Sequence, residues 1–206
     1  MRSVAGSEHP YEDRVLVDKE RGLFAVADGV TRSSRGSGAV AAELALGLLR
    51  EYYSGDIPSA IERVHRSARE RREKDKTIGE TTLTAVGVSD AEFQSGNVGD
   101  SPAYLVRRGE VVGLVQEDRG PWGNITQVIG APERVNVHSR HLRLKDRDVV
   151  LVASDGVTHV LHPSLIDQFV LKGSVEEIAD AIIEEAKSAR TGYDDDKSVI
   201  VVRLMI

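Results

Sequence analysis

Two apolar strands that each end in Asp-Gly constrain this chain more than any other feature. Residues 23–29 read Leu-Phe-Ala-Val-Ala-Asp-Gly, which suits a strand that is buried on both faces and ends abruptly in a carboxylate and a glycine. Residues 149–156 repeat the design as Val-Val-Leu-Val-Ala-Ser-Asp-Gly. Because hard divalent cations prefer oxygen ligands held on rigid elements, the pair outlines a metal site. For either copy alone, an ordinary Asp-Gly turn is the competing interpretation.

Composition narrows the class of protein. The 206 residues suffice for one domain with a substantial core, and hydrophobic and charged shares of 40% and 29% are ordinary for a soluble globular protein. The formal net charge of -6 argues against nucleic acid as a partner, and the absence of cysteine excludes disulfides and thiolate chemistry. No apolar run suits a membrane span or a signal peptide. We therefore expect one cytoplasmic domain over residues 1–206, with neither nucleic acid nor membrane as a partner.

The expected elements place helices early and late, with strands between them. Strands are expected at residues 14–18, 23–29, 81–88, 92–98, 103–106, 111–115, 135–144, 149–156 and 198–205. Helices are expected at residues 39–53, from 56 onward, at 125–129, and from a capping box at 174–177 to about residue 189. This order favours two sheets packed together and covered by helices.

Acidic residues lie at the ends of these strands. They are Glu12, Asp13, Asp28, Asp100, Asp155, and the run of Asp194, Asp195 and Asp196. If the strands end together, only a bound cation would make so much buried negative charge tolerable. Ligands that are all oxygen favour magnesium or manganese over zinc or copper. Two such ions could lower the pKa of a shared water and direct it at a phosphorus or carbonyl centre.

Six short motifs resemble those of one known family. They are Glu12-Asp13, Phe24-Ala25-Val26-Ala27-Asp28-Gly29, Gly79-Glu80-Thr81-Thr82, Asn97-Val98-Gly99-Asp100-Ser101, Ser154-Asp155-Gly156 and Asp195-Asp196-Lys197-Ser198-Val199-Ile200. From Glu12 to the C-terminus, their order and spacing resemble the PPM-type, or type 2C, metal-dependent serine/threonine protein phosphatases. The resemblance implies an α+β fold, a four-layer α/β/β/α sandwich of two antiparallel sheets flanked by helices. It also implies a single PPM-type phosphatase domain over residues 1–206.

The resemblance further implies a centre of two Mn²⁺ or Mg²⁺ ions. The ligand set by position is Glu12 and Asp13 for one ion, Asp155 and Asp195 for the other, Asp28 as the bridge, and the carbonyl of Gly29. Asp100, together with Asp155, lies where the family can hold a weaker third ion. Catalysis would run through Asp28 and Asp155, by direct attack of a metal-activated water on phosphoserine or phosphothreonine. The implied partner is a phosphorylated protein, either a serine/threonine kinase or a kinase target.

One departure from the family pattern concerns the substrate phosphate. Glu8 stands where bacterial members usually carry an arginine that grips this phosphate. An acid would repel a phosphate, so the candidate replacements are Arg14, Arg32 and Arg35, the last two from the loop after Asp28. The alternative for Arg32 and Arg35 is that they are solvated loop arginines.

Other departures concern the third ion, the proton donor and the last motif. His159 replaces an acid that helps to bind the third ion, and since it carries no negative charge we expect a weakened or lost third site. Val30 stands where some members place a histidine; His9 is the histidine nearest in sequence to the first Asp-Gly motif, and His159 is the nearest to the second. For both we favour a structural role over proton donation. Asp196 replaces the usual asparagine and adds a charge without a predicted consequence.

Two other functions compete with phosphatase activity. A catalytically weakened PPM-fold module with a regulatory or binding role is supported by Glu8 and His159 and opposed by the retained acidic motifs. Nucleotide binding is suggested by residues 36–41, which fit a loose glycine-rich fingerprint before a helix. A Rossmann site, however, needs those glycines directly after the first strand, and here Asp28 and a polar loop intervene. We therefore expect these small residues to permit close packing of the helix.

Overall fold

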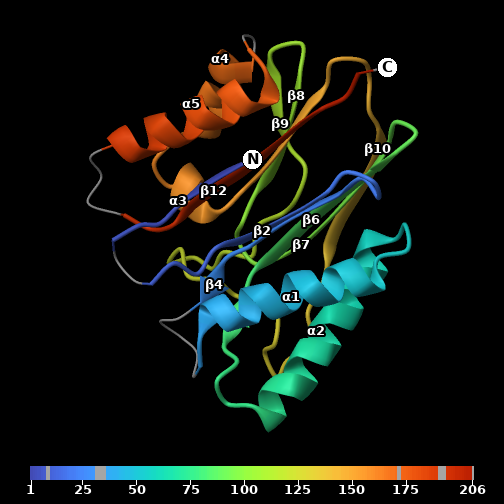
Figure 1. Cartoon of the computed structure of the whole chain (residues 1–206), viewed down its shortest axis with the longest axis vertical. Helices are drawn as coiled ribbons and strands as arrows, with labels where there is room; N and C mark the ends of the chain where they lie inside the picture. The colour runs from blue at the N-terminus through green and yellow to red at the C-terminus, as the bar shows by residue number, and fades with distance from the viewer. Residues whose placement is uncertain (8–9, 31–35, 171–172, 190–193, 206) are drawn as a thin grey trace.

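Two five-stranded sheets form the centre of the computed structural model, which describes all residues except 8–9, 31–35, 171–172, 190–193 and 206 (Figure 1). The first sheet runs in the order β1 (Arg2–Val4), β12 (Lys197–Arg203), β11 (Val149–Ala153), β8 (Ala103–Arg107) and β9 (Glu110–Gly113). The second runs β10 (His138–Arg143), β7 (Glu92–Val98), β6 (Leu83–Ser89), β3 (Leu23–Ala27) and β2 (Arg14–Asp18). A short separate pair joins β4 (Gly29–Val30) to β5 (Glu80–Thr81). All these pairings are antiparallel.

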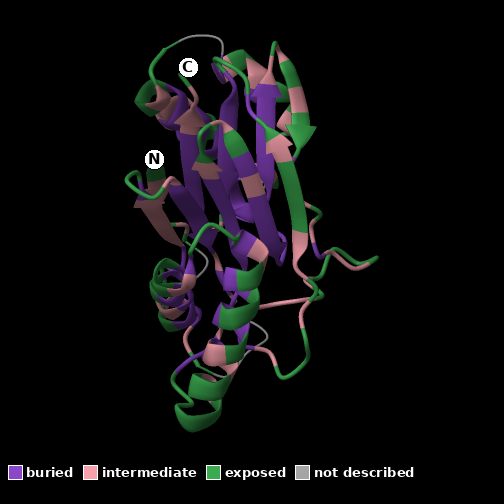
Figure 2. Ribbon diagram, turned by 90° about the vertical axis from the view of Figure 1, so that its right-hand side faces the viewer, coloured by how far each residue is buried: buried purple, intermediate pink, exposed green. Residues whose placement is uncertain are grey.

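Helices cover the outer face of each sheet. The second sheet is covered by α1 (Gly38–Tyr52) and α2 (Ile57–Lys74). The first is covered by α3 (Asp155–Thr158), α4 (Ile166–Val170), which follows a 3-10 turn at Pro163–Leu165, and α5 (Val175–Ser188). Figure 2 shows buried strands between helices whose outward faces are exposed. This four-layer α/β/β/α arrangement confirms the expected α+β fold class. No helix among the described residues has the length and apolarity needed to cross a membrane.

Alternate residues of β3 belong to two different cores. Leu23, Ala25 and Ala27 lie in the core that the second sheet shares with α1 and α2. Phe24 and Val26 lie in the core between the two sheets, and β11 divides its side chains in the same way. Successive strand residues point to opposite faces, so a strand with cores on both sides must be apolar at every position. The burial of residues 23–27 on both faces, predicted from the sequence, is confirmed.

The helices begin where side chains can satisfy their first backbone N–H groups. Ser37 and Asp56 cap α1 and α2 with side-chain oxygens. At the start of α5, the Glu177 N–H donates to Ser174 Oγ at 3.2 Å, and the Ser174 N–H donates to Glu177 Oε2 at 2.7 Å. This reciprocal pair confirms the predicted capping box.

The short helix predicted at residues 125–129 is wrong. Ile125 forms an isolated antiparallel bridge with Arg119, and Ile129 forms one with Thr81. The Ile129 N–H donates to the Thr81 carbonyl at 2.8 Å, and the Ile129 side chain is fully buried in the core beneath α1 and α2. The four-residue spacing of the two isoleucines resembled a helix period, but tertiary pairing holds this segment extended. The short helices α3 and α4 were also not predicted from the sequence.

Gly29 and Gly38 bring the start of α1 into backbone contact with β4. A Cβ on Gly29 would lie 2.4 Å from the Gly38 carbonyl carbon, and a Cβ on Gly38 would lie 2.6 Å from that of Gly29. No side chain larger than hydrogen fits between these segments. The close helix packing expected from residues 36–41 is therefore present, with the Asp28-Gly29 segment as its partner.

Replacing Gly38 with alanine should destabilise the protein by about 1–3 kcal/mol, because the new methyl group must push backbone apart. The matched control is Gly47→Ala in the same helix, where the added Cβ has no atom within 4 Å. That control should be neutral or stabilise the helix by up to about 1 kcal/mol. Urea unfolding of both variants measures the difference. Equal stability of the two would contradict the packing described for Gly29 and Gly38.

Candidate metal centre

Strand register brings the acidic strand ends together. The last residue of β3 pairs with the first of β2, so Asp28 and Asp13 lie beside each other at one end of the second sheet. In the first sheet, the end of β11 lies beside the beginnings of β12 and β8, which brings Asp155, Asp195 and Asp100 to the corresponding end. Since strands of the two sheets pack face to face through the central core, these ends form one acidic region.

Asp28 lies at the centre of this region. Its backbone is fixed, because its N–H donates to Thr82 Oγ1 at 3.0 Å and its carbonyl accepts from the Thr82 N–H and from Thr81 Oγ1, both at 2.8 Å. Burial raises the Asp28 pKa well above its usual range. Four nearby carboxylates raise this pKa further: Asp13, Asp155, Asp195 and Asp100. The structure therefore brings together five of the acids selected from the sequence.

Asp13 is buried, and among the described residues the nearby Ser154 and Ser198 hydroxyls act on its carboxylate without well-aligned hydrogen bonds. Its side chain has no solvent exposure, and neither carboxylate oxygen has a partner with hydrogen-bond geometry. Burial raises the Asp13 pKa to about 7, against 3.8 for a free carboxyl group; the nearby Ser198 and Ser154 hydroxyls oppose this shift. A buried carboxylate without well-aligned hydrogen bonds is costly unless a cation binds there.

The donor chemistry fits a hard divalent cation. The side chains around Asp28 supply carboxylate oxygens, which suit Mg²⁺ and Mn²⁺. Within the described ranges, however, no three Asp, Glu or His side chains stand close enough to form a preassembled ligand set. The acids therefore share a region without converging on one point.

Asp196 holds the Glu12-Asp13 segment in place. Its Oδ2 accepts from the Glu12 N–H at 2.6 Å and from the Asp13 N–H at 3.2 Å, while its Oδ1 accepts from the Gly6 N–H at 2.8 Å. One carboxylate thus fixes the backbone that carries Asp13. The sequence singled out Asp196 only as an added charge, and its role as an anchor became visible only in the structure.

Replacing Asp196 with alanine should cost about 2–4 kcal/mol of stability, because three backbone N–H groups lose a charged acceptor. We also expect weaker Mn²⁺ binding, since Asp13 would lose its fixed position. The matched control is Asp146→Ala, which removes an exposed carboxylate whose ion-pair partner, Arg147, is also exposed, and it should cost under about 1 kcal/mol. Chemical denaturation and Mn²⁺ titration test both effects. Equal losses in the two variants would contradict the anchoring role.

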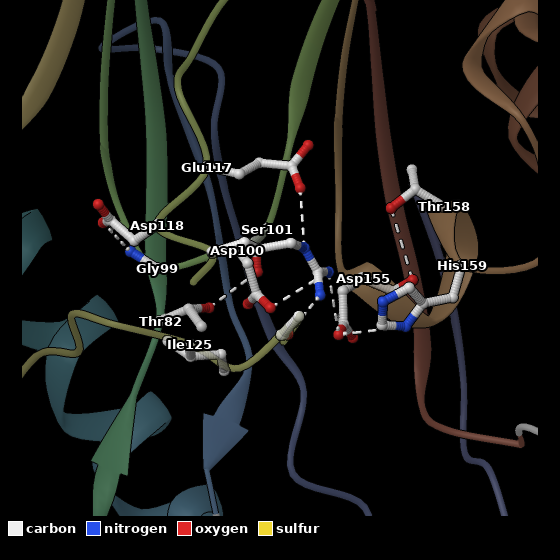
Figure 3. Close-up of polar contacts among 12 residues, drawn as sticks. Thr82, Gly99, Asp100, Ser101, Glu117, Asp118, Ile125, Asp155, Thr158 and His159 are labelled. Atoms are coloured by element: carbon white, nitrogen blue, oxygen red, sulfur yellow. Dashed lines mark hydrogen bonds and ion pairs between the residues drawn. The ribbon is translucent and has the colours of Figure 1, made fainter. Parts of the chain in front are cut away.

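The expected third-ion position contains a cationic side chain. Arg119 Nη2 lies 3.2 Å from Asp100 Oδ2 and 3.5 Å from Asp155 Oδ2. His159 Nδ1 lies 3.4 Å from the same Asp155 oxygen. Figure 3 shows Asp100 and Asp155 turned toward the same point. No motif in the sequence pointed to Arg119.

The candidate phosphate anchors are only partly described. Arg32, Arg35 and Glu8 lie outside the described residues, as does His9. The Arg14 guanidinium contacts other groups of the protein: its Nε lies 3.1 Å from Glu43 Oε2, and its Nη1 donates to the Asp13 carbonyl at 2.8 Å. Arg14 is therefore a structural clamp at the start of β2. Glu12 also has a structural contact, because its Oε1 accepts from the Ala39 N–H at 3.3 Å near the start of α1.

A family model described as Protein phosphatase 2C matches residues 2–191. The chain belongs to the protein phosphatase 2C family. This membership confirms the family predicted from the motifs, and it supports the predicted enzyme class of phosphoprotein phosphatases. The chain is also 31% identical over 142 residues to stage II sporulation protein E of Bacillus subtilis (strain 168). That match covers 65% of this chain but only 16% of the relative's length.

Solved protein phosphatase 2C-type structures share the fold along nearly the whole chain. The Mycobacterium tuberculosis serine/threonine phosphatase PstP/Ppp superposes with a TM-score of 0.85 at 22% identity, covering 100% of this chain and 97% of the other. The catalytic domain of PstP in complex with two manganese ions gives a TM-score of 0.83 at 23% identity, covering 98% and 96%. At these identities the likeness establishes the architecture.

A surface cavity lies away from the acidic region. It has a volume of about 740 Å³ and is bordered by Arg107, Lys145, Asp148 and Arg203, at the start of β11. Asp155 follows the end of β11, so the cavity and the acidic region lie at opposite ends of this strand. In this protein phosphatase 2C family member, buried charge and not this cavity distinguishes the acidic region.

Proposed function

We propose that this chain hydrolyses phosphoserine and phosphothreonine monoesters in proteins, with two Mn²⁺ or Mg²⁺ ions held around Asp28. The observation that carries the proposal is the concentration of buried carboxylates there, with Asp13 buried and its oxygens without well-aligned hydrogen bonds among the described residues. Membership of the protein phosphatase 2C family supports the same reaction.

Each ligand would come from a segment next to the end of a strand. Asp28 would help to hold both ions, since four other carboxylates act electrostatically on its side chain, and Gly29 would add its backbone carbonyl. Asp13 would serve one ion from the segment that also carries Glu12, and Asp155 and Asp195 would serve the other. Asp100 and His159, expected at a third ion, are left out of the pair because Asp100 contacts Arg119.

The chain's own contribution is to hold these groups still. Thr81 and Thr82 fix the Asp28 backbone and Asp196 fixes that of Asp13, so neither needs to reorganise during the reaction. When bound, the ions would supply Lewis acidity and activate a water for attack on phosphorus. Asp28 and Asp155 would thus act in catalysis by positioning this water. Arg32 or Arg35 would bind the substrate phosphate.

Phosphatase assays with p-nitrophenyl phosphate and a phosphothreonine peptide test this function. Turnover should depend on added Mn²⁺ and disappear with EDTA. Absence of turnover on both substrates, with a normal circular dichroism spectrum and melting curve, would contradict the enzyme and favour the regulatory or binding module. Turnover on the small ester but not on the peptide would contradict the protein-phosphatase assignment alone.

A further inference from the structure

Each nitrogen of the Arg119 guanidinium has an acceptor within the protein. Besides its contacts with Asp100 and Asp155, its Nε lies 3.1 Å from Glu117 Oε2 and its Nη1 donates to the Gly123 carbonyl at 3.3 Å. The side chain is only 24% exposed, and that of Asp100 is 2% exposed. An arginine that binds an external ligand keeps donors available to that ligand. In Arg119, by contrast, every guanidinium nitrogen contacts an acceptor within the protein.

The backbone of Arg119 is fixed to the same turn that carries Asp100. The Asp118 N–H donates to the Gly99 carbonyl at 2.9 Å, and the Gly99 N–H donates to Asp118 Oδ2 at 2.8 Å. The Thr126 N–H donates to the Asp118 carbonyl at 2.8 Å. The backbone of Arg119 also forms an isolated antiparallel bridge with Ile125. Arg119 and Asp100 are therefore held at a fixed separation by two reciprocal hydrogen bonds (Figure 3).

One carboxylate oxygen of Asp155 contacts two protein groups. Asp155 Oδ2 lies 3.5 Å from Arg119 Nη2 and 3.4 Å from His159 Nδ1. The Asp155 side chain is only 11% exposed. Arg119 therefore meets a largely buried carboxylate on its Asp155 side, as it does on its Asp100 side.

We propose that Arg119 is a built-in cation that occupies the position between Asp100 and Asp155, so that this phosphatase binds two divalent ions and excludes a third. This inference rests on the metal centre proposed above. The guanidinium neutralises the charge that a third ion would otherwise balance, and its volume leaves no room for one. A fixed positive charge also needs no dissolved metal, so activity should saturate at the metal concentration that fills two sites.

The test is to count Mn²⁺ ions per chain at saturation, by equilibrium dialysis with atomic absorption and by titration calorimetry. The wild-type chain should bind two ions and Arg119→Ala should bind three, because the variant leaves Asp100 and Asp155 without a cation. Arg119→Ala combined with Asp100→Asn should return to two. The matched control Arg143→Ala, which removes an exposed arginine of β10, should remain at two.

Two further variants keep the inference testable if Arg119→Ala folds poorly. Arg119→Lys retains a positive charge and should bind two ions. Asp100→Asn in the otherwise wild-type chain should also bind two, because Asp100 contacts Arg119 and would not be an ion ligand. A loss of an ion in Asp100→Asn would overturn the inference.

Other outcomes separate this inference from the proposed function. A wild-type chain that binds three ions, or an Arg119→Ala chain that still binds two, would overturn the role of Arg119 and leave the two-ion centre standing. An unchanged ion count with a raised KM for the phosphopeptide in Arg119→Ala would make Arg119 a substrate ligand instead. A wild-type chain that binds no Mn²⁺ would overturn the metal centre and this inference together.

Discussion

Replacing Asp28 with asparagine is expected to lower phosphatase activity by about 10³-fold or more while the fold stays intact. The substitution removes the charge of the proposed bridge between two ions, and a loss of about 4 kcal/mol of transition-state stabilisation corresponds to that factor. Asparagine has nearly the same shape, and the hydrogen bonds to Thr81 and Thr82 use the Asp28 backbone. Measurements of kcat/KM with p-nitrophenyl phosphate and a phosphothreonine peptide, together with a melting curve, check this result.

Two further variants serve as a second test and a control for the loss of activity in Asp28→Asn. Asp155→Asn should lose activity to a similar extent, since it also removes a ligand charge. Asp146→Asn removes an exposed carboxylate from the turn before β11, at the far end of that strand, and should leave activity unchanged. If Asp28→Asn kept most of the wild-type activity, the metal centre would have been misplaced.

Metal-free protein should lose stability as the pH rises from about 4 to about 7, and Mn²⁺ should reverse this loss. Asp13 and Asp100 each have a pKa raised to about 7 by burial, and the Asp28 pKa is raised as well. The folded chain therefore binds protons more tightly than the unfolded chain. Stability falls with pH wherever the folded state holds more protons, so the penalty is absent at low pH and complete above about pH 7.

Bound Mn²⁺ should favour the ionised carboxylates and remove that penalty. At a free concentration 100-fold above Kd, binding stabilises the folded state by about 2.7 kcal/mol, or about 5–10 °C in melting temperature for a chain of this size. The metal-dependent increase should therefore be small near pH 5 and large near pH 8. Scanning calorimetry with Mn²⁺ and with EDTA across this range measures it.

The informative quantity is the difference, at each pH, between the melting temperature measured with Mn²⁺ and that measured with EDTA. His65 is buried and its pKa is lowered, so its protonation destabilises the fold at acid pH whether or not metal is present. Asp13→Asn provides the matched variant: it should melt at a higher temperature than wild type in EDTA at pH 8 and gain less from Mn²⁺. An identical pH profile with and without Mn²⁺ in the wild-type protein would contradict this explanation.

The sequence predicted the strand framework because burial on both faces leaves a direct pattern. Residues 23–27 and 149–153 are apolar throughout, since each strand has a core on either side. Asp28 and Asp155 follow the ends of these two strands, and the strand register then places both acids near Asp13. Local pattern and family motifs were therefore sufficient to predict the fold and the acidic region.

Contacts between loops that are distant in the chain could not be predicted from the sequence in the same way. Arg119 meets Asp100 and Asp155 only because the chain folds back at Asp118 onto the Gly99 turn, and neither periodicity nor motif records that return. Asp196 has an anchoring role because its carboxylate reaches backbone 183 and 184 residues earlier in the chain. The helix predicted at residues 125–129 failed for the same reason, since pairing with Thr81 decides the conformation of Ile129.

Anomalous diffraction from crystals grown with Mn²⁺ tests the central claim most directly. We expect two manganese peaks bridged by the Asp28 carboxylate, with Asp13, Asp155 and Asp195 as further ligands and the Gly29 carbonyl within coordination distance. Arg119 should remain in contact with Asp100, without a third peak between Asp100 and Asp155. Manganese bound elsewhere, or no peak near Asp28 at saturating Mn²⁺, would contradict the account.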